Sequence, residues 1–186
     1  NVHPVSMTQL QEDSYQTVLE EVRGELEQTV EDKGFNRSRI NVLAALTKLR
    51  QICNHPALVL GEEGRTHNSG KLDALRELLS DALSGGHKII VFSQFVKMLK
   101  LIREELEQQG INYLYLDGST RKRMEKVREF NSNPEVEVFL ISLKAGGVGL
   151  NLTAADMVIH VDPWWNPMVE RQATDRAHRL GQENRV

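Results

Sequence analysis

A short segment near the end of the chain, residues 170–182 (ERQATDRAHRLGQ), carries three arginines: Arg171, Arg176 and Arg179. The segment predicts a helix on which Arg176 and Arg179, three residues apart, project from one face. A guanidinium group is always charged and binds phosphate oxygens through paired N–H donors, which suits a phosphoryl group in transfer. A charge run is usually a solvated face. Interleaved polar residues that mere solubility does not require favour phosphate binding here: Gln172, Asp175 and His178.

Glycines gather in residues 142–151 (SLKAGGVGLN), directly after an apolar run. Gly146, Gly147 and Gly149 let the backbone approach a ligand closely and present its N–H groups to an anion. Ser142 and Lys144 add a hydroxyl donor and a positive charge. An ordinary glycine-rich connection has the same composition, so this loop alone leaves both interpretations open.

Two further segments carry groups suited to nucleic acid. Trp164 and Trp165 are adjacent, so both cannot face one core, and one indole is free to stack on a base or against a duplex. Core packing is nevertheless the commoner fate of tryptophan. The turn sequence DGST at 117–120 precedes the basic run RKR at 121–123, which suits a phosphate backbone and equally a solvated helix start.

Residues 57–72 imitate a strand followed by a phosphate-binding loop but lack its chemistry. That loop needs four residues between its glycines and Ser or Thr after its lysine to hold magnesium. Here five residues separate Gly64 from Gly70, and Leu72 follows Lys71. Asp175 is no substitute for a magnesium-binding acid, because it lies within a predicted helix and not at the end of a strand. The sequence therefore contains no nucleotide-cradling loop of its own.

The composition bounds the class of protein. The chain has 186 residues, 40% of them hydrophobic and 26% charged, enough for one large domain or a domain with an appendage. The formal net charge is −3, so any contact with nucleic acid must come from a local patch. A single cysteine, Cys53, excludes an internal disulfide and fits a reducing compartment. The histidines show no metal-ligand spacing, and no apolar run is long enough to cross a bilayer.

Apolar periodicity divides the chain into two parts. Repeats of three and four residues predict one helix through residues 15–30, ended by Gly34, and another through residues 40–52, ended near Asn54. Residues 61–70 have the composition of a linker or loop. From Ser69 onward, helices alternate with apolar strands at 88–92, 113–116, 136–141 and 157–161, and a last helix begins at Asn166 and Pro167. This alternation predicts an α/β fold with a parallel sheet covered on both faces and a helical extension.

These motifs, in this order, resemble the second RecA-like lobe of a Swi/Snf-type superfamily 2 ATPase, the family of chromatin remodellers and DNA translocases. The matching segments cover nearly the whole chain: LRQICNHPAL at 49–58, SGKL at 69–72, IIVFSQF at 89–95, LDGST at 116–120, residues 142–152, DPWWNP at 162–167 and the arginine helix through Gln182. The resemblance implies a RecA-like parallel sheet sandwiched by helices, with a helical protrusion over residues 1–68 and the helicase C-terminal lobe over residues 69–186.

The resemblance also implies roles for individual residues. In this family two RecA-like lobes close on ATP with Mg²⁺, and the second lobe supplies arginine fingers, which match Arg176 and Arg179. Four residues would lie towards the nucleotide: Gly149, Asn151, Gln172 and Asp175. Eight would contact DNA: Ser93, Gln94, Gly118, Ser142, Lys144, Gly146, Gly147 and Trp165. No DNA contact is carried over to residues 121–123, because this basic segment is shorter than in many family members, and no metal ligand is assigned.

The implied function is the C-terminal motor lobe of an ATP-dependent double-stranded DNA translocase or remodeller. Its partners would be double-stranded DNA and the N-terminal RecA-like lobe of the same polypeptide, with no membrane contact and a monomeric state. ATP and Mg²⁺ would be bound by the complete two-lobed enzyme. This chain alone, without a P-loop lobe and ending before the segment that braces the two lobes, is expected to be inactive. The location would be a prokaryotic cytoplasm, or the nucleus of a eukaryote.

Two alternatives stay open at the level of sequence. One is a non-catalytic nucleic-acid-binding module whose arginines meet the phosphate backbone and no ATP. The other is a lobe of an RNA helicase with the same fold. The QICNHP and WWNP segments favour the Swi/Snf resemblance over this alternative. A P-loop encoded upstream in the parent gene would exclude the first. The sequence does not specify the organism or the DNA-bound protein on which the parent acts.

Overall fold

The computed structural model describes residues 2–33, 35–145, 150–163, 168 and 173–175. The chain divides into two compact units, Asn1–Leu75 and Arg76–Val186. The helix α5 (Gly70–Ser84) begins in the first unit and continues in the second.

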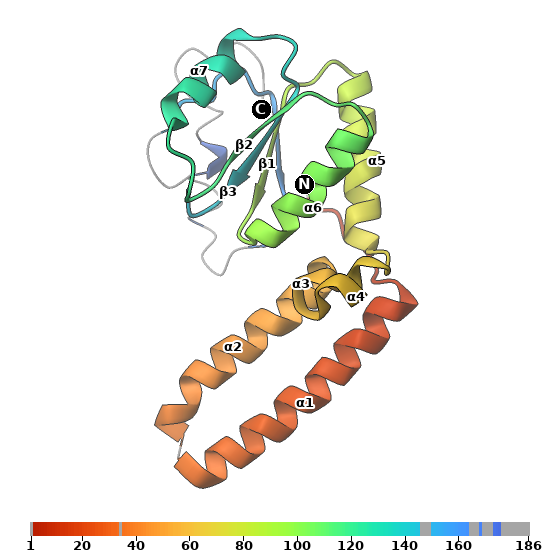
Figure 1. The fold of residues 1–186 in the computed structure, drawn as a ribbon, viewed down its shortest axis with the longest axis vertical. Helices are drawn as coiled ribbons and strands as arrows, with labels where there is room; N and C mark the ends of the chain where they lie inside the picture. The colour runs from red at the N-terminus through yellow and green to blue at the C-terminus, as the bar shows by residue number, and fades with distance from the viewer. Residues whose placement is uncertain (1, 34, 146–149, 164–167, 169–172, 176–186) are drawn as a thin grey trace. The chain divides into compact units, whose positions relative to one another are not determined.

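A hairpin of two long helices forms most of the first unit (Figure 1). Helices α1 (Gln9–Lys33) and α2 (Phe35–Asn54) pack along each other through a small apolar core of Val18, Val22, Ala45, Leu49 and Ile52. Both helices were predicted from their periodicity. However, the apolar residues that marked α2 do not all face α1, since Ile40 is 77% exposed and Leu43 is 60% exposed.

Residues 57–65, which separate α2 from α5, are more ordered than the composition of residues 61–70 indicated. They form two single-turn helices, α3 (Ala57–Leu60) and α4 (Glu62–Arg65), joined by Gly61 with a φ of 63°. The prediction of a plain linker over 61–70 was therefore wrong for α4. The strand-like run 57–60 is helical, which agrees with rejecting a strand and phosphate-binding loop here.

A buried amide, that of Gln11 (0% exposed), joins three helix ends of the first unit. Thr8 and Gln11 cap α1 reciprocally: each backbone N–H donates to the other's side-chain oxygen at 3.2 Å. Gln11 Oε1 also accepts from the Gly70 N–H at 3.1 Å, and Gln11 Nε2 donates to the Ile52 carbonyl at 2.9 Å. One side chain thus ties the start of α1, the end of α2 and the start of α5. The predicted N-cap of α5 is confirmed, because the Leu72 N–H donates to Ser69 Oγ at 3.3 Å.

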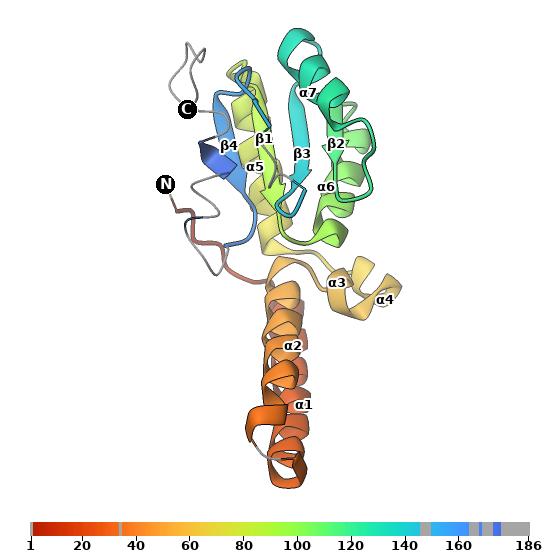
Figure 2. The ribbon, with the colours of Figure 1, turned by 90° about the vertical axis from the view of Figure 1, so that its left-hand side faces the viewer.

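A parallel four-stranded sheet forms the centre of the second unit, as the apolar runs predicted. Its strands are β1 (Ile89–Ser93), β2 (Tyr113–Leu116), β3 (Val138–Ser142) and β4 (Met157–His160). They are ordered β2-β3-β1-β4, and every pair is parallel (Figure 2). The register places Ser93 beside Ser142 and Phe92 beside His160.

Helices cover both faces of this sheet. Helix α6 (Val96–Gln108) links β1 to β2 and α7 (Arg123–Ser132) links β2 back to β3, in opposite directions across the sheet. Because parallel crossovers are right-handed, these opposite directions place α6 and α7 on opposite faces (Figure 1). Gly86 and Gly110, with φ values of 75° and 69°, follow α5 and α6, as expected for glycines that stop helices.

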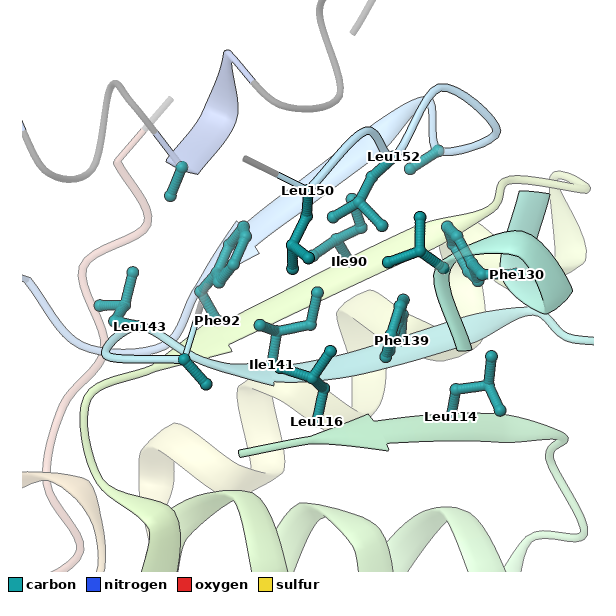
Figure 3. Packing of buried hydrophobic residues seen from close by; sticks show 14 of the residues in the cluster. Ile90, Phe92, Leu114, Leu116, Phe130, Phe139, Ile141, Leu143, Leu150 and Leu152 are labelled. Carbon is teal, nitrogen blue, oxygen red and sulfur yellow. The ribbon is translucent and has the colours of Figure 1, made fainter. Parts of the chain in front are cut away.

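Alternate residues of the strands build the core on the α7 side (Figure 3). Phe92 and Ile141 come from the central strands, and Phe130 from α7 packs 5.1 Å from Phe139 between ring centroids. The chain beyond residue 149 returns to this core through Leu150 and Leu152. The core therefore holds the segment after β3 as well as the strands themselves.

No helix in the described part of the chain is long and apolar enough to cross a membrane.

We expect Gly64→Ala to destabilise the protein. An added Cβ would stand 2.5 Å from the Ala57 nitrogen and 2.6 Å from the Pro56 carbonyl carbon, and backbone atoms of α3 cannot move aside as a side chain does. The expected loss is about 1–3 kcal/mol, typical of overpacking, measured by urea unfolding. Gly24→Ala is the control: its Cβ meets nothing within 4 Å, and helix propensity favours it by roughly 0.5–1 kcal/mol. Equal stability of the two variants would show that α3 and α4 are not packed as closely as these distances require.

Candidate functional site

The carboxyl ends of all four strands meet at one edge of the second unit, because the strands are parallel. Several residues that the sequence singled out follow these strands directly. Ser93 and Gln94 end or follow β1, Ser142 ends β3, with Lys144 just beyond it, and Gly118 follows β2. The fold therefore places at one edge residues that lie far apart in the sequence. We call this edge, with residues 93–95, 117–120, 142–145 and 160–163, the strand-end face.

A buried carboxylate joins two segments of the strand-end face. Asp162 is 2% exposed, and its Oδ1 accepts a hydrogen bond from Ser93 Oγ at 2.5 Å. Its Oδ2 accepts the Gln94 N–H at 3.1 Å. Asp162 thus ties the end of β1 to the segment that follows β4. At the level of sequence Asp162 was only the first residue of the DPWWNP motif, with no predicted role; an acid directly after an apolar strand was the only available signal.

Ser93 and Gln94 differ in what they offer a partner. The Ser93 side chain is fully buried; its hydroxyl donates to Asp162 and accepts the Phe95 N–H at 3.0 Å. Gln94 is partly exposed, and its Nε2 donates to the Pro163 carbonyl at 3.3 Å. Ser93 therefore orders the loop internally, while Gln94 reaches the surface beside the residue that precedes Trp164. Contact of either residue with DNA stays a prediction.

The segment after β3 is anchored at both ends of its glycine-rich stretch. On one side, the Leu143 N–H donates to the Ser93 carbonyl at 3.0 Å and the Ala145 N–H to the Ser142 carbonyl at 2.9 Å, while Lys144 is exposed. On the other side, Asn131 of α7 donates to the carbonyl of exposed Asn151 at 2.8 Å. Three predicted residues lie outside the described residues: Gly146, Gly147 and Gly149.

The turn after β2 is organised by Asp117. Its Oδ1 accepts the Ser119 N–H at 2.8 Å and the Ser119 hydroxyl at 2.6 Å, and these hydrogen bonds hold the pKa of the Asp117 carboxyl below its usual range. Arg123 Nη2 donates to the Gly118 carbonyl at 3.3 Å, and Lys122 pairs with Glu125 at 3.0 Å. Two members of the basic run 121–123 therefore make contacts within the protein.

Ala173 and Thr174, within the arginine-rich segment 170–182, pack against the second unit. Ala173 is 5% exposed and belongs to the core cluster on the α7 side, while Asp175 is exposed. Thr174 Oγ1 lies 3.1 Å from Nε2 of His160, the last residue of β4. The remaining residues predicted here lie outside the described residues: Trp165, Gln172, Arg176 and Arg179. His160 and Thr174 had no role predicted from the sequence, since their contact joins residues 14 positions apart.

The described residues offer no metal centre of their own. Within them, no group of three His, Cys, Asp or Glu side chains is placed to hold a metal ion.

We expect Asp162→Ala to lower the melting temperature, because it leaves the buried Ser93 hydroxyl and the Gln94 N–H without their acceptor. The expected cost is roughly 1–3 kcal/mol. Asp162→Asn keeps one acceptor oxygen and should fall between wild type and the alanine variant. Asp81→Ala, at an exposed position of α5, is the control and should melt like wild type. If Asp162→Ala melts like Asp81→Ala, the carboxylate does not hold the two segments together.

Several known proteins are similar to this chain. Residues 70–181 match the helicase conserved C-terminal domain family. An uncharacterized ATP-dependent helicase of Mycoplasma pneumoniae is 43% identical over 153 residues, 81% of this chain and 15% of that protein. The chromatin-remodeling ATPase INO80 of Candida albicans is 48% identical over 120 residues, 63% of this chain and 9% of that protein. The chain therefore spans less than a sixth of the length of these relatives.

A solved structure gives the same fold over almost the whole chain. The SWI2/SNF2 ATPase core of Sulfolobus solfataricus, in complex with dsDNA, superposes with a TM-score of 0.80 at 36% identity. The match covers 98% of this chain and 38% of that one. The chain belongs to the helicase conserved C-terminal domain family, and within it to the C-terminal RecA-like lobes of Swi/Snf-type ATPases.

Proposed function

We propose that this chain is the C-terminal motor lobe of an ATP-dependent double-stranded DNA translocase or remodeller. The observation that supports it most is the strand-end face, where the parallel sheet gathers Gln94, Gly118 and Lys144 and where Asp162 joins two loops. The relatives are named as an ATP-dependent helicase and a chromatin-remodeling ATPase, and the Sulfolobus core is in complex with dsDNA. From the strand-end face and from these relatives we infer that the whole protein uses ATP to move along DNA.

In this proposal the arginine segment acts on ATP. Arg176 and Arg179 act as fingers: they neutralise charge that develops on the transferred phosphoryl group, which is an electrostatic and positioning role. Gly149, Asn151 and Gln172 lie towards the nucleotide, together with Asp175. The lysine and the acids that hold ATP with Mg²⁺ come from the N-terminal RecA-like lobe of the same polypeptide.

The DNA backbone is the second ligand of the proposed lobe. Lys144 is an exposed cation two residues beyond the end of β3, and Gln94 adds an amide directly after Ser93, which pairs with Ser142. The hydroxyls of Ser93 and Ser142 are in buried side chains, so their residues would meet phosphates through backbone groups and loop shape. The other proposed contacts are Gly118, Gly146, Gly147 and Trp165. Because these groups bind phosphate and sugar, recognition would be independent of base sequence.

The alternatives are distinguished by ATP and by the type of nucleic acid. A non-catalytic binding module or an RNA helicase lobe could use the same face, but the names of the relatives favour an ATPase, and the dsDNA complex favours DNA. We further propose a monomer in a prokaryotic cytoplasm; the relatives named here come from a bacterium and a fungus.

The sharpest prediction concerns Arg176→Ala and Arg179→Ala in the complete two-lobed enzyme. Each should lower kcat by roughly 10²-fold or more, because an arginine finger stabilises the transition state, while KM for ATP and Kd for DNA change much less. Lysine should rescue poorly, since an ammonium lacks the planar fork. The measurement is steady-state ATPase kinetics with a thermal melt of each variant. Arg128→Ala, an exposed arginine of α7, is the matched control. Near-normal kcat in a folded alanine variant would remove that arginine from the finger role.

A second prediction tests the DNA contact. Lys144→Ala should weaken binding of duplexes of any sequence to a similar extent and reduce the slope of log K against log salt by about one, the value for a lost phosphate contact. Lys100→Ala, exposed on α6, is the control and should leave both unchanged. The measurement is fluorescence anisotropy across a salt series with two unrelated duplexes. An unaltered slope for Lys144→Ala, or an effect confined to one duplex, would argue against a backbone contact.

A further inference from the structure

His160 lies between the sheet and the start of the arginine segment. It is the last residue of β4, and its ring stacks on Phe92 with centroids 5.3 Å apart and planes 18° apart. Phe92 is fully buried in the core of β1, so it presents a fixed flat surface to the imidazole. The orientation of the His160 ring is therefore set by the sheet.

The other edge of this ring meets the arginine segment. His160 Nε2 lies 3.1 Å from Thr174 Oγ1, a hydrogen bond in either direction, because a hydroxyl both donates and accepts. The neighbouring Ala173 is buried in the core cluster. Burial at Ala173 and a hydrogen bond at Thr174 therefore hold these two adjacent residues against the second unit.

We propose that His160 is a positioning residue: through its hydrogen bond to Thr174 it holds in place the residues that directly precede Arg176 in the sequence. The catalytic part of this inference rests on the proposed function, in which these arginines act on ATP. A group that stabilises a transition state must be placed closely, and a misplacement of about 1 Å costs roughly 10²-fold in rate. Thr174 precedes Arg176 by two residues in the sequence, and we expect its displacement to change the placement of both arginines.

The test uses variants that separate the hydrogen bond from the ring stack. His160→Phe keeps an aromatic ring on Phe92 and removes the nitrogen, whereas His160→Gln restores a polar atom near the position of Nε2. Thr174→Val removes the hydroxyl with little change of shape, and Thr174→Ser keeps it. His3→Phe, at an exposed position near the N-terminus, is the matched control.

In the complete two-lobed enzyme, His160→Phe and Thr174→Val should each lower kcat about 10-fold, a partial version of the misplacement effect. KM for ATP and Kd for DNA should change little. The losses should not add in the double variant, because both single variants remove the hydrogen bond between His160 and Thr174. His160→Gln and Thr174→Ser should recover most of the rate, and His3→Phe should match wild type.

A second measurement is independent of catalysis. Hydrogen exchange of the backbone amides of residues 173–175 should be faster in both His160→Phe and Thr174→Val than in wild type, with exchange in β1 and β3 unchanged. If Arg176→Ala and Arg179→Ala prove to have normal kcat, the finger proposal fails and hydrogen exchange alone decides the positioning role. Unchanged exchange over 173–175 in folded Thr174→Val would overturn the inference, whatever the kinetics of His160→Phe. A loss of rate that follows the melting temperature alone would overturn it as well.

Discussion

Parallel pairing of four strands is the constraint on which the candidate site depends. A parallel sheet directs every carboxyl end to the same edge, and the pairing of β1 with β3 on one side and β4 on the other fixes which loops become neighbours. The strands hold this arrangement because β1 and β3 are buried along their whole length. The first residue of each loop is held in place by the strand that it follows. Residues farther along the loop are held less firmly by the strand pairing.

Two polar side chains, those of Asp162 and His160, hold segments in place beyond the strand ends. Asp162 accepts from the hydroxyl of Ser93 and from the Gln94 N–H, and His160 bonds Thr174 while it stacks on Phe92. Asp162 and Ser93 are buried, and buried polar groups are costly unless they are satisfied, so this pair allows few alternative arrangements. The strand-end face is therefore ordered by side chains that point into the protein, which leaves exposed groups such as Lys144 to meet a ligand.

In the first unit, the neutral amide of Gln11 likewise joins segments that lie far apart in the sequence. Gln11 satisfies backbone groups of Thr8, Ile52 and Gly70 at once, at a place where three helix ends would otherwise leave N–H and C=O groups buried without partners. Because α5 starts at Gly70 and continues into the second unit, this amide fixes the first turn of an element that both units share.

The sequence by itself determined the elements and the class of fold, because apolar runs, helix periodicity and capping residues act over a few neighbouring positions. It located β2 at 113–116, the N-cap at Ser69 and the stops at Gly86 and Gly110. Only the tertiary structure decided which apolar residues of α2 face a partner, as exposed Ile40 and Leu43 illustrate, and that α4 forms within a linker-like composition. It alone paired Asp162 with Ser93, 69 positions away, because such a hydrogen bond depends on how strands are ordered in space and leaves no local pattern along the chain.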